Sequence, residues 1–88
     1  MMVIEQIYLE CINDYSAKFF SIVLLEEGGL WSCMRTHGPL GGPMDRWSPK
    51  AAGTTEAKAR AAFASLMREK ARHGYEVSPN LPRYLVYR

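Results

Sequence analysis

The run from Lys18 to Glu27, KFFSIVLLEE, constrains the fold of this chain more than any other segment. Apolar residues occupy both alternating faces of the run, and most of them are aromatic or β-branched. A strand has this pattern when it is covered on both sides or lies in the middle of its sheet. We therefore predict that this segment is the core strand of a β-sheet.

Two further strands are predicted around this run. Between residues 4 and 12 the side chains alternate, with Ile7, Leu9 and Cys11 together on one face. Turns are expected at 13–16, which is rich in Asn, Asp and Ser, and at the glycine pair 28–29. Over residues 30–37 one strand face carries Trp31, Cys33, Arg35 and His37. Residues 38–49 hold three Gly and three Pro, so we expect at most a short edge strand at 45–48.

One helix is predicted over residues 55–73. Thr54 and Thr55 can cap its start, and Gly74 stands where a left-handed residue ends a helix. Between them, apolar residues recur at three- and four-residue spacing, which gives one apolar stripe: Ala59, Ala62, Phe63, Leu66 and Met67. We expect Phe63 and Leu66 to anchor the helix against the sheet.

These elements predict an α+β fold, a small antiparallel β-sheet with one α-helix packed across one face. A chain of 88 residues has room for one domain, which we place at residues 1–78. The tail at 79–88 has two prolines followed by an alternating segment from Tyr84 to Tyr87. We expect that segment to add an edge strand or to lie loosely on the surface.

Composition narrows the class of protein. Hydrophobic residues make up 48% of the chain and charged residues 23%, close to the averages of globular domains. The sequence has no run of about 18 apolar residues and starts without the features of a signal peptide, so we expect a cytoplasmic protein with no membrane partner. Cys11 and Cys33 lie in predicted strands rather than in CxxC pairs, which favours buried, reduced thiols.

The sequence contains no recognisable catalytic constellation. The loop HGPLGG lacks the Lys and Ser/Thr of a phosphate loop, and Glu26 and Glu27 point to opposite faces of a strand. Neither His37 nor His73 has a nucleophile or an acid placed to form a relay with it. We therefore predict no enzyme activity, no catalytic residue, no cofactor, no metal and no small-molecule substrate.

Charge is distributed unevenly along the chain. Residues 1–30 carry one Lys and five acids, which gives −4, whereas residues 31–88 carry ten Lys or Arg and four acids, which gives +6. Arg35 and His37 share a strand face with Trp31, and Arg46, Trp47 and Lys50 follow closely. Cations interleaved with aromatic rings are typical of nucleic-acid contacts. The alternative is that the tryptophans fill the core and the basic helix is a solvated face.

Three segments of the chain resemble the WGR domain, a module found beside the catalytic domain of poly(ADP-ribose) polymerases and alone in many bacterial proteins. Residues 17–20, AKFF, are similar to the NKFY-like signature that opens the second strand of the family. Residues 37–41, HGPLG, align with its WGR-[IV]-G segment, and the helix from Ala59 to Tyr75 ends in the family's basic stretch and GY. The resemblance implies an antiparallel sheet with a helix across one face, and no catalysis.

Two positions of this chain depart from the family motif. His37 stands at the Trp position and Pro39 at the Arg position that give the family its name and that touch a DNA end or a neighbouring domain in the polymerases. Pro39 offers neither a charge nor an amide donor. Lys18, Arg35 and His37 are partial substitutes.

The leading hypothesis is a non-catalytic module of the WGR type that binds nucleic acid, with DNA and its strand ends as the candidate partner. In this hypothesis the phosphates are met by Lys18, Arg35 and Arg46, while His37 and Gly38 contact a strand end or sugar. The alternative is a protein-interaction module that has lost DNA-end binding. Its exposed aromatic residues, predicted as Trp47, Tyr84 and Tyr87, would dock on another polypeptide or on a second copy.

Overall fold

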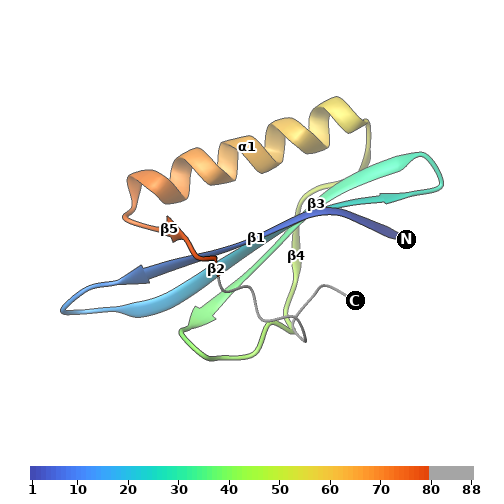
Figure 1. Ribbon diagram of the computed structural model, residues 1–88. Helices are drawn as coiled ribbons and strands as arrows, with labels where there is room; N and C mark the ends of the chain where they lie inside the picture. The colour runs from blue at the N-terminus through green and yellow to red at the C-terminus, as the bar shows by residue number, and fades with distance from the viewer. Residues whose placement is uncertain (80–88) are drawn as a thin grey trace.

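Within the described residues, five antiparallel strands form one sheet and one helix lies across one of its faces (Figure 1). The computed structural model describes residues 1–79. The elements are β1 (Met2–Ile12), β2 (Ala17–Glu27), β3 (Leu30–Pro39), β4 (Ser48–Thr54), α1 (Glu56–Arg72) and β5 (Glu76–Val77). Their order in the sheet is β4-β3-β2-β1-β5, and the predicted α+β class is confirmed. The strand predicted at 84–87 lies outside the described residues.

Strand β2 is the middle strand of the sheet, as its apolar run predicts. Every residue from Phe19 to Leu25 is buried, because β1 and β3 flank the strand and both of its faces are covered. The register places Phe20 opposite Leu9 of β1 and opposite His37 of β3.

The main core lies between the sheet and α1. Ala59 and Leu66 are almost completely buried and Phe63 is 8% exposed, which confirms the predicted helix stripe and its two anchors. The small Ala59 side chain allows the helix backbone to approach the sheet closely. The buried residues of this helix-side core come from three strands and the helix: Leu9, Phe20, Ile22, Leu24, Cys33, Ala59, Phe63 and Leu66.

A second apolar cluster lies on the sheet face away from the helix. Tyr8 and Phe19 stack there with ring centroids 5.5 Å apart, and Met44 and Trp47 of the β3–β4 loop pack against them. The indole Nε1 of Trp47 donates a hydrogen bond to the backbone oxygen of Met44 at 3.1 Å. The expectation that Trp47 is an exposed docking residue is therefore wrong, because the ring is half-buried in this cluster. Trp31 is also half-buried, against the helix-side core.

The two edge strands differ from the prediction. Strand β4 spans Ser48–Thr54 instead of residues 45–48, and it pairs with β3 in spite of Pro49 and Gly53. An edge position tolerates proline because one side of the strand needs no ladder partner, and the register shifts at Cys33 absorb the irregularity. The two-residue strand β5 was not anticipated, and it pairs with Leu9 and Glu10 of β1.

Both ends of α1 carry the predicted caps. The Thr55 hydroxyl accepts a hydrogen bond from the Lys58 backbone nitrogen at 3.2 Å. At the other end, Gly74 has φ of 87°, its nitrogen donates to the Ala71 oxygen, and the Tyr75 nitrogen donates to the Lys70 oxygen. These two bonds are those of a Schellman motif. The motif reverses the chain and returns Tyr75 to the sheet.

Candidate nucleic-acid interface

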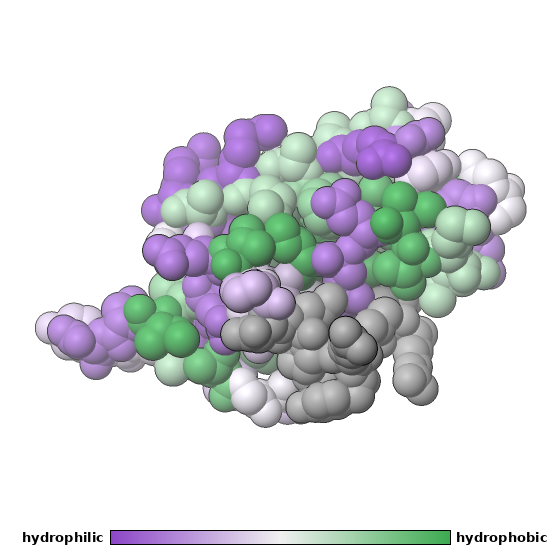
Figure 2. Space-filling view, in the orientation of Figure 1, coloured by the Kyte–Doolittle hydropathy of each residue, from purple (hydrophilic) through white to green (hydrophobic). Residues whose placement is uncertain are grey.

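A hollow of about 310 Å³ opens between the C-terminal half of α1 and strands β2 and β3. It lies on the helix side of the sheet, beyond the end of the close-packed core. Seven side chains from the helix, the two strands and the segment after α1 line it: Phe20, Arg35, His37, Leu66, Glu69, Lys70 and Tyr75. Hydrophilic side chains gather over this end of α1 in the space-filling view (Figure 2).

Three rings form the inner wall of the hollow. Phe20 is buried, and the imidazole of His37 lies parallel to it, with centroids 5.9 Å apart and planes at 7°. Tyr75 meets Phe20 edge to face, at 6.1 Å and 71°. The stack follows from the strand register, because Phe20 and His37 are directly opposite residues on one face of the sheet.

Positive side chains surround these rings. The Lys70 ammonium lies 4.4 Å from the Phe20 ring centroid and 5.8 Å from that of Tyr75. Lys18 lies 5.6 Å from the centroid of Tyr75, and Arg35 lines the hollow from β3. Cations over aromatic faces gain an electrostatic attraction that holds their head groups in place. The one carboxylate among the described lining residues is Glu69, whose Oε1 lies 3.7 Å from Lys70 Nζ.

Tyr75 remains neutral in this setting. Burial raises the pKa of its hydroxyl, and the Cys11 thiol acts in the same direction. The phenol is therefore protonated at neutral pH and can donate a hydrogen bond to an anion in the hollow.

The structure brings together three of the five residues predicted to bind nucleic acid. Arg35 and His37 line the hollow, and Lys18, on the same side of the sheet, lies beside it over the Tyr75 ring. Gly38 faces the other way, and a Cβ at this position would lie 3.3 Å from the Phe19 ring, so it serves packing. Arg46 is exposed in the β3–β4 loop, whose neighbouring residues pack on the face away from the helix.

Sequence reasoning missed Lys70, Tyr75 and Phe20 as site residues. A signal for Lys70 was present, because Phe63, Leu66 and Lys70 follow the three- and four-residue spacing of the apolar stripe. The stripe therefore ends in a cation that faces the sheet rather than the solvent. The sequence around Tyr75 does not indicate that its ring contacts Phe20. That contact depends on the Schellman motif, which reverses the chain, and on the packing of the helix against the sheet.

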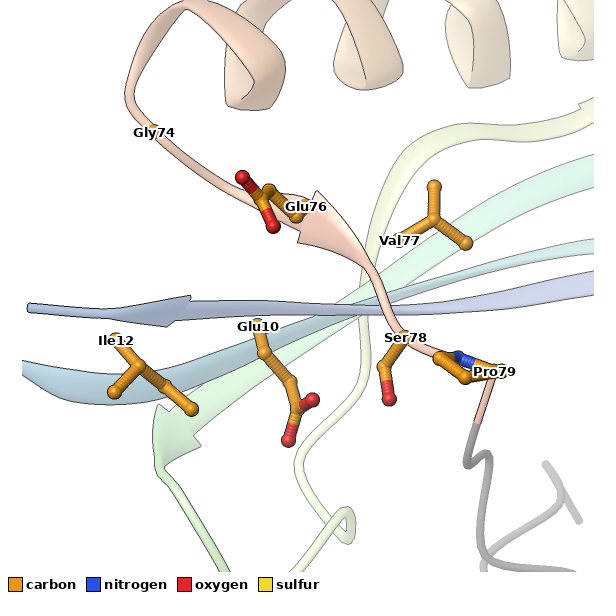
Figure 3. A pocket seen from close by; sticks show the side chains of 7 residues that line it. All are labelled: Glu10, Ile12, Gly74, Glu76, Val77, Ser78 and Pro79. Atoms are coloured by element: carbon orange, nitrogen blue, oxygen red, sulfur yellow. The ribbon is translucent and has the colours of Figure 1, made fainter.

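A second hollow, of about 300 Å³, lies at the β1–β5 edge (Figure 3). Glu10 and Glu76 line it, but their carboxyl groups point to different places and do not converge on one point (Figure 3). Within residues 1–79, no three His, Cys, Asp or Glu side chains gather where they would hold a metal ion. In the same range no helix is long and apolar enough to cross a membrane.

The basic-aromatic hollow, defined by Phe20, Arg35, His37, Lys70 and Tyr75, can hold an anion beside a planar group. Its cations suit phosphate oxygens, and its rings suit a flat, polarisable partner. Comparison of the chain with protein-family models, with curated proteins and with solved structures finds no match. The resemblance to the WGR domain stays a prediction.

Proposed function

We propose that this domain binds nucleic acid, without catalysis, through the basic-aromatic hollow. The observation that carries the proposal is the meeting of Lys18, Arg35 and Lys70 around the rings of Phe20, His37 and Tyr75. Nucleic acids present phosphates and flat bases at a short, regular spacing, and proteins meet them with cations and rings. The hollow offers both kinds of contact from three separate elements of the fold.

The family resemblance supports the same site. Its three matched segments are far apart in sequence, and each contributes a residue to the hollow: Phe20 from the first, His37 from the second and Tyr75 from the third. Pro39 pairs with Lys18 at the adjoining end of β3. The position that carries the family's Arg is thus beside the cations of this chain.

Titration of labelled DNA with the full chain, followed by fluorescence anisotropy, tests the proposal. Single-stranded, blunt and nicked DNA are compared at about 50 mM and about 200 mM salt, because phosphate contacts weaken steeply with salt. Lys70→Ala and Arg35→Ala should each weaken binding. Lys58→Ala is the control, because it removes the same charge about 18 Å from Lys70 along the helix axis, at ~1.5 Å per residue. This variant should bind DNA with nearly the affinity of the wild type. No binding at low salt would overturn the proposal and favour the protein-interaction alternative.

Removal of the negative charge of Glu69 should raise the affinity for DNA, where the lysine and arginine variants lower it. Its carboxylate competes with a phosphate for Lys70, because the two side chains lie 3.7 Å apart. We expect Glu69→Gln to tighten DNA binding several-fold at low salt, about 1 kcal/mol for an ionic contact released near the surface. The gain should shrink as salt rises. An unchanged affinity in Glu69→Gln would mean that Lys70 does not meet the phosphates.

A further inference from the structure

We infer that the basic-aromatic hollow receives an unpaired base, so that this domain binds single-stranded nucleic acid in preference to duplex. The inference rests on the proposed function and specifies the form of its ligand. It follows from the position of one ring, the imidazole of His37.

His37 presents an exposed ring at the rim of the hollow. Its inner face lies parallel to the Phe20 ring at a centroid distance of 5.9 Å, and the side chain is exposed. On the outer side, the pairing of β4 with β3 ends at Arg35, opposite Ser48. In the part of the chain that the structure describes, β3 therefore has a strand partner at His37 only on the β2 side. The side of His37 toward β4 has no paired strand, which leaves room there for a flat group against the ring.

The Phe20–His37 pair makes this face a rigid platform. Phe20 is 4% exposed and Tyr75 holds it edge-on, so the imidazole is backed by a ring that belongs to the core. A platform that is already ordered loses little conformational entropy when a ligand stacks on it. Base–ring stacking of this kind is tolerant of sequence, because every base has a π-face.

A base within a duplex cannot use the platform. Both of its faces are covered by neighbouring base pairs, and the ring of His37 stands at the rim of a hollow whose opposite wall is the helix. An unpaired base can turn out of its strand and stack on a side chain, as in single-strand recognition generally. Lys18, Arg35 and Lys70 surround the same rings and would meet the phosphates on either side of that base.

The test compares a labelled single strand of about 20 nucleotides, long enough to exceed one binding site, with its blunt duplex. The full chain should bind the single strand at least about five-fold more tightly, which is the contribution of one stacked base. His37→Ala should weaken single-strand binding by about five-fold or more and leave duplex binding nearly unchanged. His37→Phe keeps a ring of similar size and should retain the single-strand preference.

Two measurements separate the possible failures. Thermal melting of His37→Ala checks that Phe20 and the core stay folded, and the salt dependence of binding should be the same in His37→Ala and His37→Phe. Equal affinity for single strand and duplex, with His37→Ala weakening both alike, would overturn the inference and leave the proposed function standing. Absence of binding to either nucleic acid would overturn both.

Discussion

Cys33 lies on β3 between Leu24 of β2 and Ala51 of β4, and its side chain is fully buried. Burial raises the pKa of the thiol from 9.0 to about 11, against the opposing effect of Arg35 and Lys50. The folded state therefore favours the protonated thiol. The contribution of this thiol to the free energy of unfolding is fully present below pH 9.0 and is lost as the pH rises through about 11.

We predict that the free energy of unfolding falls by about 1 kcal/mol between pH 8 and pH 10 because of Cys33 alone, at ~1.4 kcal/mol per pKa unit. Urea unfolding of the wild type and of Cys33→Ala at both pH values measures this fall. The variant is less stable at pH 8, but the difference between the two proteins should narrow at pH 10. An equal fall in both proteins would show that the thiol does not titrate in this way.

At the scale of an element, the C-terminal cap of α1 decides where Tyr75 lies. Gly74 adopts φ of 87°, a conformation that is costly for a residue with a side chain, although a Cβ here would meet only Cys11 Sγ, at 3.8 Å. We predict that Gly74→Ala lowers the free energy of unfolding by about 1–2 kcal/mol, the cost of the left-handed conformation. Gly74→Asn should lose less, because Asn adopts this conformation more readily. Chemical denaturation measures the free energy of unfolding of both variants. Equal losses in Gly74→Ala and Gly74→Asn would show that the left-handed conformation of residue 74 is not the cause.

The helix stripe supports a second prediction at this scale. Phe63 is 8% exposed, and it also lines an open groove together with Met67. We predict that Phe63→Ala destabilises the domain by about 3 kcal/mol, the low end for truncation of a core phenylalanine, because the groove allows partial relaxation. Lys58→Ala, at an exposed position of the same helix, should change stability by no more than about 0.5 kcal/mol. Thermal melts that shift equally in both variants would contradict the packing of this stripe.

At the scale of the whole molecule, the net charge is small but the positive side chains are unevenly distributed. The net charge is only +2, yet three of the eleven Lys and Arg residues, Lys18, Arg35 and Lys70, converge on one hollow. If these three carry the phosphate contacts, the logarithm of single-strand affinity should fall with the logarithm of salt concentration with a slope of about −2. Titrations at four or more salt concentrations measure the slope. A slope much steeper than about −5 would mean that the basic surface as a whole, and not the hollow, binds the nucleic acid.

The sequence by itself determined most of the fold. The apolar run from Lys18 to Glu27 predicts the middle strand, and the stripe from Ala59 to Met67 with its caps predicts the helix almost to the residue. These features are periodic and local, so the pattern of side chains specifies them without knowledge of their neighbours. The edge strands were misjudged because pairing with β3 and β1 outweighs the weak propensities of Pro49, Gly53 and the short segment at 76–77.

The site depended on the tertiary structure. Alternation along β3 placed Arg35 and His37 on one face. Gly38 and Arg46 were expected outside this strand, in the Gly- and Pro-rich segment, where alternation does not apply, and only the structure shows that β3 continues through Gly38 to Pro39. Register then put Phe20 beside His37, and the turn at Gly74 returned Tyr75 to the same place. Such contacts join residues far apart in the chain, and their formation depends on how whole elements pack. A local pattern can name the side chains that bind, but only the packed sheet and helix decide which of them meet.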